Sequence, residues 1–507
     1  MFEPTTSDST FTDFTQITNP FSDAYNLPVD NFTSLSALRA GYSEQYIQQY
    51  LNQIEKTQQS GENLGHRDLI NPIAEIATVS AITTNTDAGN TLSTANPSTV
   101  SLTPTNYNDS VGTSDLNDYY SFSLSKTSKF ALAVSGLSIF SDIDVELLNS
   151  SGVKIAESKN WVFLDESIQK TLNAGSYYVR VFPYYGSSNY TLTVLDNYNS
   201  TSGSGLVNAA AAVGKALNQS PFADIPNLGG NNWGADLIKA PEVWNRGYTG
   251  SGIIVAVVDT GVDRTHPDLA GNIWTNTREI AENNRDDDNN GYVDDVYGWN
   301  FNDNNNNTLD GHSHGTHVAG TIAGIGNNIG VTGIAYNSKI LPVKVLDDQG
   351  RGSLSSVAQG VRYAADNGAK VINLSLGGSV ESSEFQAAIQ YASSKGAIVV
   401  MAAGNSGSAT PGYPAAYATN WGLAVGAVNQ NNNFASFSNQ AGSNPALAYV
   451  TAPGVNVYST TPNNSYRTYS GTSMASPHVA GVVALMLDAN PNLTELQIRD
   501  ILMQTSA

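Results

Sequence analysis

The segment GTSMASPHVAGVVALML, residues 471–487, joins a cluster of small residues to an apolar run. The run contains no turn residue and is too long for a typical strand, so it predicts a buried helix. Thr472 and Ser473 stand where a helix N-cap is expected, and Pro477 is tolerated only in a first helical turn. The Ser473 hydroxyl could then attack a carbonyl while the helix end stabilises the oxyanion. A serine that only caps a core helix is the alternative, but the surrounding small residues leave room for a substrate.

Two other segments supply a carboxylate and an imidazole. The β-branched run at residues 253–258 predicts a strand buried in a parallel sheet, and Asp259 follows it at the edge where open α/β folds place their sites. The segment GHSHGTHVAG, residues 311–320, offers three histidines, namely His312, His314 and His317. A serine hydroxyl needs a base within hydrogen-bond reach, and a neutral imidazole can serve. Spacing alone does not choose among the three.

The three segments resemble the Asp, His and Ser blocks of the subtilisin family of serine proteases, in that family's chain order. The resemblance covers residues 231–507, where alternating helix and strand patterns are typical of a doubly wound sheet. It implies an α/β fold with a mostly parallel sheet and a serine endopeptidase that forms an acyl-enzyme. It assigns Ser473 as the nucleophile, His314 as the base and Asp259 as the group that orients the imidazolium. Asn405 matches the asparagine of the oxyanion hole.

The same resemblance implies the walls of the substrate cleft. Backbone at 350–352 should pair with an extended substrate, and residues 375–377 and 402–404 should form the S1 pocket. The residues implied are Gly350, Arg351, Gly352, Ser375, Leu376, Gly377, Ala402, Ala403 and Gly404. The pocket residues among them are small or apolar and carry no fixed charge. We therefore expect protein or peptide substrates and broad specificity, with large apolar residues preferred at P1.

The segment DDDNNGYVDD, residues 286–295, predicts a calcium loop. It places oxygen side chains at alternate positions before a glycine, as in the first half of an EF-hand. The closing glutamate is absent, so Asp294 or Asp295 must complete the shell. The predicted Ca²⁺ ligands are Asp286, Asp288, Asn290, Tyr292, Asp294 and Asp295. A solvated acidic loop is the alternative, although like charges this close favour a bound cation. The family resemblance implies a second calcium site at Asp268 and Asn327.

Composition limits the classes of partner. The chain has 507 residues, a net charge of −21 and no cysteine. The length suggests two or three domains, and the charge argues against nucleic acid or anionic membranes while it fits cation binding. No apolar run reaches membrane-spanning length, and no signal peptide is visible. The family resemblance nevertheless favours a secreted or extracytoplasmic protein, which we expect to be a monomer.

The N-terminal part differs in character from the rest. Residues 1–97 are expected to form a disordered leader with one amphipathic helix at 43–56 and a Thr/Ser/Asn linker at 77–97. Residues 98–196 show short alternating strands between turn residues, which predicts a β-sandwich. This region is similar to the bacterial pre-peptidase C-terminal (PPC) domain, which implies binding to a substrate or surface. A solubilising spacer is the alternative.

The segment GSGLVNAAAAVGKAL, residues 203–217, resembles the strand and helix that end a subtilisin catalytic domain. The chain itself stops soon after the helix of Ser473. We therefore hypothesise that this closing segment completes the catalytic domain in cis, which would make that domain permuted. A linker helix followed by a truncated C-terminus is the alternative.

Two other functional classes remain open at this point. The spacing of His312, His314 and His317 fits the His-x-His-x-x-His pattern of a metallo-β-lactamase-type zinc hydrolase, although that family has Asp where Thr316 stands. The chain could also be a calcium-dependent binding protein that keeps the fold without catalysis. If the subtilisin resemblance holds, His312 and His317 are structural.

Overall fold

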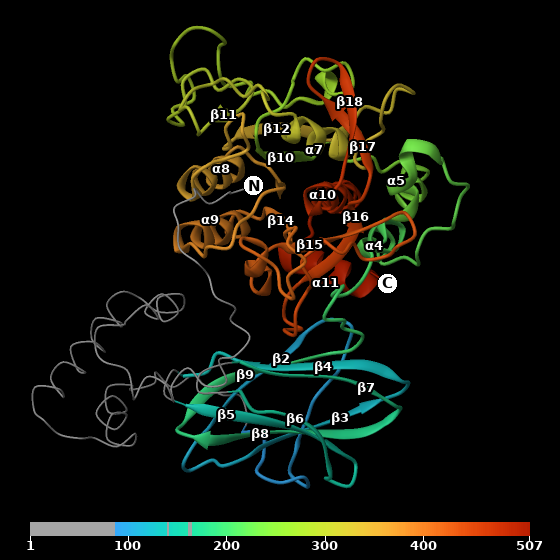
Figure 1. The fold of residues 1–507 in the computed structure, drawn as a ribbon, viewed down its shortest axis with the longest axis vertical. Helices are drawn as coiled ribbons and strands as arrows, with labels where there is room; N and C mark the ends of the chain where they lie inside the picture. The colour runs from blue at the N-terminus through green and yellow to red at the C-terminus, as the bar shows by residue number, and fades with distance from the viewer. Residues whose placement is uncertain (1–86, 139–140, 161–164, 507) are drawn as a thin grey trace, which may run out of the picture. The chain divides into compact units, whose positions relative to one another are not determined.

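The computed structural model describes residues 87–138, 141–160 and 165–506 (Figure 1). The amphipathic helix expected at 43–56, and the leader around it, lie outside the described residues. Among the described helices, none combines the length and the apolar character that a membrane crossing requires.

The first part is a β-sandwich, as the alternating pattern predicts (Figure 1). Its strands are β1 (Asn96–Pro97), β2 (Thr105–Val111), β3 (Asp118–Leu124), β4 (Ser128–Ser135), β5 (Asp142–Asn149), β6 (Lys154–Ser158), β7 (Glu166–Leu172), β8 (Gly175–Tyr185) and β9 (Ser188–Leu195). One sheet has the order β1-β3-β8-β5-β6, and the other has the order β2-β9-β4-β7. Alternate side chains of the two sheets form one core, in which Phe122 stacks on Phe130 at 4.6 Å.

The described end of the expected linker belongs to this sandwich. Asn96 and Pro97 pair in parallel with Tyr120 and Ser121 of β3, and Ala88 is fully buried in the core. The polar composition of 87–97 hides this role, because a short strand that pairs with a distant segment leaves no local periodicity.

The second part contains a parallel sheet of the order β11-β12-β10-β13-β14-β15-β16. Its strands are β10 (Ile254–Asp259), β11 (Trp299–Asn300), β12 (Lys339–Lys344), β13 (Val371–Leu374), β14 (Ile398–Ala402), β15 (Leu423–Val428) and β16 (Tyr449–Pro453); the hairpin β17 (Val457–Thr461) and β18 (Ser465–Tyr469) is antiparallel. The buried β-branched runs account for the central strands, because both faces of the sheet are covered.

Helices cover both faces of the sheet, which confirms the doubly wound α/β class (Figure 1). They are α4 (Ala209–Ala216), α5 (Trp233–Leu237), α6 (Ala240–Trp244), α7 (His314–Ala323), α8 (Leu354–Asp366), α9 (Ser383–Ser394), α10 (Thr472–Ala489) and α11 (Glu495–Thr505). Helices α8 and α9 pack against each other, while α10 packs against α7 and α4. Helix α8 starts at the Ser353 side chain, which accepts a hydrogen bond from the Ser356 N–H, and stops before Gly368 at φ +80°.

The closing segment, residues 203–217, lies beside β16 and α10. Leu206 forms a parallel bridge with Thr451, whose N–H donates to the Gly205 carbonyl at 2.7 Å while its own carbonyl accepts from Val207 at 2.9 Å. Helix α4 then packs against α10 and α11, with Val213 fully buried. These contacts add an extended stretch to the edge of the sheet and a helix to one of its faces.

Candidate active site

Helix α10 begins earlier than a cap at Thr472 or Ser473 would require. Gly471 is the N-cap, so Ser473 is the second helical residue and Pro477 the sixth. The expectation that Pro477 lies in the first turn is therefore wrong. A proline at this position leaves the carbonyl of Ser473 without its helical N–H donor. The Ser375 hydroxyl takes the place of that donor, at 2.7 Å from the Ser473 carbonyl oxygen.

Asp259 and His314 form the contact that the sequence predicts for a catalytic pair. His314 Nδ1 lies 2.8 Å from Asp259 Oδ1 and 3.0 Å from Oδ2. Asp259 ends β10 and is fully buried, while His314 is the first residue of α7. Burial opposes the charged imidazole, but the Asp259 carboxylate outweighs it, so the pKa of His314 is raised above its usual 6.5. The pair is therefore arranged to stabilise an imidazolium.

Ser473 lies at the same edge of the sheet as this pair. Strands β10, β13 and β14 are neighbours, and Asp259, Ser375 and Asn405 lie at or just beyond their carboxyl ends. The Ser473 hydroxyl donates to the Ser375 carbonyl at 3.0 Å, so it must rotate away from that carbonyl before it can reach an imidazole. Serine–base contacts in substrate-free sites are often loose and tighten only when substrate binds.

Two N–H donors face one space beside Gly471. The Oδ1 atom of Asn405 accepts from the Thr472 N–H at 2.8 Å and from the Thr472 hydroxyl at 3.0 Å, which fixes the orientation of the amide. A Cβ atom built on Gly471 would lie 3.5 Å from Asn405 Nδ2 and 3.7 Å from the Ser473 backbone nitrogen. This arrangement can hold an oxyanion, since both nitrogens border a space that Gly471 leaves without a side chain.

The three histidines do not converge on a common point. His317 is fully buried, and its Nε2 lies 3.1 Å from the carbonyls of Val457 and Arg467, so it must carry a proton. Burial lowers the pKa of His317 to about 4. His312 is exposed, with its ring 6.3 Å from that of His314. Among the described residues, neither group of side chains that could hold a metal includes a histidine, which disfavours the zinc hydrolase.

The predicted substrate cleft has small, buried walls on one side. Ala402 and Ala403 are buried, and Ser375 is held by its contact with Ser473. On the other side, the Arg351 N–H donates to the Asp347 carboxylate at 2.9 Å and its carbonyl accepts from the Asp347 N–H at 2.8 Å. The Gly350 N–H also donates to the Asp347 carbonyl, at 3.0 Å, so Asp347 holds this turn in shape.

A carboxylate that the sequence pattern did not include lies beside two carboxylates of the acidic loop, residues 286–295. The carboxylates of Glu279, Asp286 and Asp288 have oxygens within 4.8 Å of one another. The EF-hand pattern did not reveal Glu279, because it precedes the loop by seven residues.

The two aspartates expected to close this loop have other partners. Asp294 accepts from the N–H groups of Asn283 and Asn284. Asp295 is fully buried and accepts from Asn276, Asn290 and the Tyr363 hydroxyl. Asp294 therefore holds the loop backbone in shape, whereas Asp295 ties the loop to neighbouring side chains.

Asp268 and Asn327 of the predicted second calcium site are in contact. The Asn327 amide nitrogen donates to Asp268 Oδ1 at 3.0 Å, and the Val331 N–H donates to Oδ2 at 3.0 Å. Both oxygens of this buried carboxylate are therefore already hydrogen-bonded.

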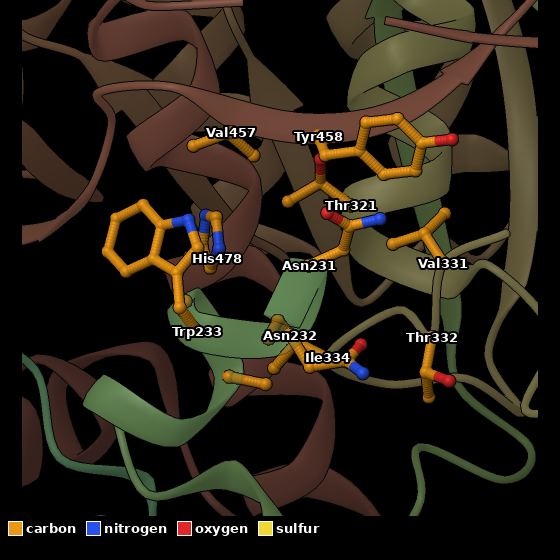
Figure 2. A pocket seen from close by; sticks show the side chains of 12 residues that line it. Asn231, Asn232, Trp233, Thr321, Val331, Thr332, Ile334, Val457, Tyr458 and His478 are labelled. Carbon is orange, nitrogen blue, oxygen red and sulfur yellow. The ribbon is translucent and has the colours of Figure 1, made fainter. Parts of the chain in front are cut away.

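A small cavity lies beside the start of α5 (Figure 2). Asn231, Trp233, Thr321 and His478 line it, and its volume is about 20 Å³. That is room for about one water molecule. None of the predicted catalytic side chains lines it, so it is not the substrate cleft.

Comparison with known proteins places both parts of the chain. The sequence profile of the Subtilase family (Peptidase_S8) matches residues 250–507, and that of the bacterial pre-peptidase C-terminal domain (PPC) matches residues 116–183. Thermitase from Thermoactinomyces vulgaris is 44% identical over 42% of this chain and 68% of its own length. Subtilisin from Bacillus pumilus is 44% identical over 54% of this chain and 90% of its own length. A crystal structure of a cold-adapted subtilisin-like serine proteinase is 36% identical, with a TM-score of 0.41, over 50% of this chain and 81% of that one. The two resemblances that the sequence predicts are confirmed.

Proposed function

The chain belongs to the subtilase family of serine proteases, and we propose that it is an endopeptidase whose acyl-enzyme forms on Ser473. The observation that carries this proposal is the contact of 2.8 Å between His314 Nδ1 and the buried Asp259. Because Nδ1 is held by the carboxylate, the proton on the ring stays there and Nε2 is left as the base for the serine hydroxyl.

The reaction begins when the Ser473 hydroxyl leaves the Ser375 carbonyl. It gives its proton to His314 Nε2 while Oγ attacks the scissile carbonyl carbon. Asp259 stabilises the imidazolium, which then protonates the leaving amine. In the second half of the reaction, a water molecule gives a proton to His314 and attacks the acyl-enzyme carbonyl. The imidazolium then returns the proton to Ser473 Oγ as the acid product leaves. The Asn405 amide and the Ser473 N–H stabilise the tetrahedral oxyanion in both halves of the reaction.

We expect large apolar residues at P1, because Ala402 and Ala403 leave space and bring no charge. A panel of peptides that differ only at P1 tests this expectation. Phe and Leu should give the highest kcat/KM, and a preference for Glu or Lys would overturn the assignment of these walls.

Calcium is proposed as a structural ion of the acidic loop. Asp286, Asp288 and Glu279 bring three carboxylates together, and hard oxygen donors suit Ca²⁺. The ion would offset the repulsion among them; Asn290 and Tyr292 lie in the same loop. A second Ca²⁺ between Asp268 and Asn327 would require the Asn327 amide to turn its oxygen toward the ion, since its nitrogen now donates to Asp268.

We also propose that residues 203–217 complete the catalytic domain. The bridge from Leu206 to Thr451 and the burial of Val213 support this role. The sandwich is proposed as an accessory module, and an extracytoplasmic location is proposed from the kinship with subtilisins.

Labelling with a serine-directed phosphonyl reagent tests the central proposal. The full chain should lose peptidase activity as one equivalent binds Ser473, and Ser473→Ala should abolish both labelling and hydrolysis. Ser470→Ala is the matched control, because this exposed serine stands three residues before Ser473 and should leave both unchanged. Hydrolysis that persists in Ser473→Ala would overturn the proposal, and so would activity that the reagent spares, as in a zinc hydrolase.

A further inference from the structure

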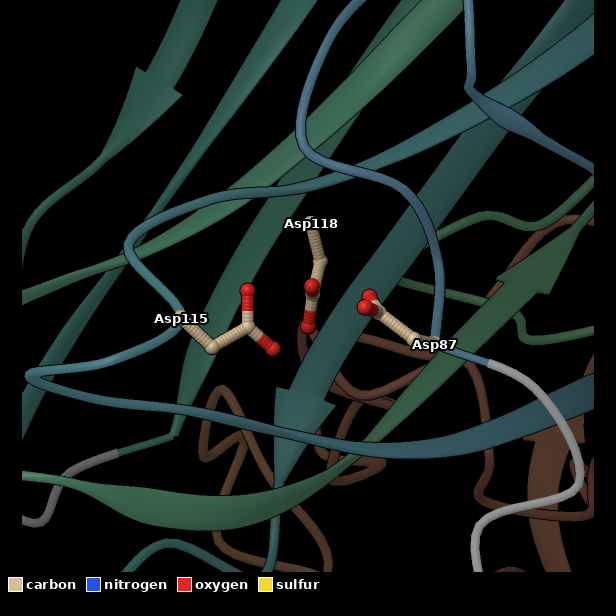
Figure 3. A group of neighbouring side chains, drawn as sticks. All are labelled: Asp87, Asp115 and Asp118. Atoms are coloured by element: carbon tan, nitrogen blue, oxygen red, sulfur yellow. The ribbon is translucent and has the colours of Figure 1, made fainter.

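Three aspartates meet where the chain enters the β-sandwich (Figure 3). Asp87 precedes β1, Asp115 lies in the loop between β2 and β3, and Asp118 is the first residue of β3. Figure 3 shows the Asp118 carboxylate between those of the other two. One oxygen from each lies within 4.8 Å of the others. Ca²⁺ binds oxygens at about 2.3–2.6 Å, so two ligands on opposite sides of the ion stand at most about 5 Å apart.

The buried member of this group has an oxygen without a partner. Asp118 is fully buried, and its Oδ2 accepts a hydrogen bond of 2.6 Å from the Tyr190 hydroxyl. Its Oδ1 has no hydrogen-bond partner among the described residues. Leaving a buried carboxylate oxygen unpaired is costly, and buried charges are normally paired or bound to a metal. The Tyr190 hydrogen bond therefore fixes the Asp118 carboxylate beside the other two, with Oδ1 left unpaired.

No basic side chain offsets these charges. Within the described part of the chain, the ion pairs of lysine, arginine and histidine involve none of Asp87, Asp115 and Asp118. The neighbouring Asp109 is also acidic, but its oxygens accept from the Ala88 and Ser110 N–H groups, so it fastens backbone. The group thus keeps a negative charge that a cation would balance.

We propose that Asp87, Asp115 and Asp118 form a Ca²⁺ site that fastens the entry segment 87–97 to β3 of the sandwich. The donors are all carboxylate oxygens, which favours Ca²⁺ over Zn²⁺, since zinc sites in proteins are built mainly from Cys and His. A site with several protein carboxylates also favours Ca²⁺ over Mg²⁺, which keeps most of its waters. This site is independent of the catalytic centre and of the acidic loop at 286–295.

Calcium binding by the full chain tests the proposal. The Ser473→Ala background avoids self-digestion, and calcium is counted by equilibrium dialysis with radioactive Ca²⁺. Asp87→Asn and Asp115→Asn should each bind one Ca²⁺ fewer per chain than the background, or bind that ion at least tenfold more weakly. Asp165→Asn is the matched control, an exposed aspartate of the same sandwich, and should bind as many ions as the background.

Hydrogen exchange read by mass spectrometry locates the effect. Ca²⁺ should slow exchange in peptides covering 87–97 and 115–120 of the background and of Asp165→Asn, but not in the two site variants. In excess chelator all four proteins should exchange alike, which shows that the substitutions leave the fold intact. An unchanged number of bound ions with unchanged affinity in both site variants would overturn the proposal, and so would equal calcium protection of these peptides in all four proteins.

Discussion

The side-chain oxygen of Asn405 accepts hydrogen bonds from both the backbone N–H and the hydroxyl of Thr472, at 2.8 and 3.0 Å. The amide cannot turn over without losing both bonds, so its nitrogen is held toward the space beside the Ser473 N–H. The residue before the nucleophile thus orients the side chain that would stabilise the oxyanion. This contact joins the loop that follows β14 to the start of α10.

Replacing Asn405 by Leu should lower kcat by about 10²–10³-fold with little change in KM, the size of effect known for loss of one oxyanion-hole donor from a subtilisin. Thr472→Val keeps the backbone N–H and removes one of the two bonds to Asn405, so its kcat should fall less. Steady-state kinetics on one peptide substrate checks both. Equal losses in the two variants would contradict a positioning role for the Thr472 hydroxyl.

The rate should depend on pH through His314. The base must be neutral, and its pKa is raised above 6.5 because Asp259 outweighs burial. Consequently kcat/KM should fall as pH drops, with a midpoint above 6.5. Asp259→Asn should lower kcat by about 10⁴-fold through loss of the correct tautomer and move the midpoint down.

The exposed His312 serves as the control for this pH profile. His312→Ala should move the midpoint less than Asp259→Asn does, since the His312 ring is exposed and 6.3 Å from that of His314, whereas Asp259 contacts His314 directly. A midpoint that shifts in His312→Ala but not in Asp259→Asn would contradict the assignment of His314 as the base.

Ser375 and Pro477 should be energetically coupled. Ser375→Ala leaves the Ser473 carbonyl without a donor and should destabilise the fold by about 1–3 kcal/mol. Pro477→Ala restores an N–H four residues after Ser473, so the double variant should lose less than the sum of the single variants. Urea unfolding in the Ser473→Ala background measures this cycle, and strict additivity would contradict it.

The closing segment should be part of the protease fold. Val213→Asp places an unpaired charge where the side chain is fully buried. A buried charge that lacks a partner costs about 3–5 kcal/mol of stability. Both the unfolding temperature of the protease and its activity should fall. Lys215→Asp is the control on the exposed side of α4 and should change stability by no more than about 0.5 kcal/mol. Loss of the sandwich alone in Val213→Asp would show that the segment belongs there.

Removing calcium should destabilise the protease. A chelator should lower its unfolding temperature and speed its autolysis, since the carboxylates of the acidic loop then repel one another. Glu279→Gln should weaken calcium binding at this loop, whereas Glu282→Gln, on an exposed neighbour, should not. Calorimetry with and without Ca²⁺ distinguishes the two, and equal calcium responses would argue against Glu279 as a ligand.

The sequence by itself determined the fold class and the identity of the predicted catalytic residues. Central parallel strands are buried on both faces, so they appear as unbroken β-branched runs, and Asp259 directly follows such a run. The small-residue segments around His314 and Ser473 allow close packing, and they stand in a chain order typical of one family. Each of these signals lies within a short stretch of the chain, so it can be recognised from the sequence without knowledge of the fold.

Only the tertiary structure decided the rest, because the contacts involved join residues far apart in the chain. The strand β1 pairs with a segment more than twenty residues away, so its polar composition gave no sign of it. Glu279 lies beside Asp286 and Asp288, although it stands outside the pattern that identified the loop. The donor for the Ser473 carbonyl is Ser375, 98 residues distant, and Asp118 shows its unpaired oxygen only when β3 is buried. Hydrogen-bond satisfaction is a property of the packed molecule, which is why no local pattern reports it.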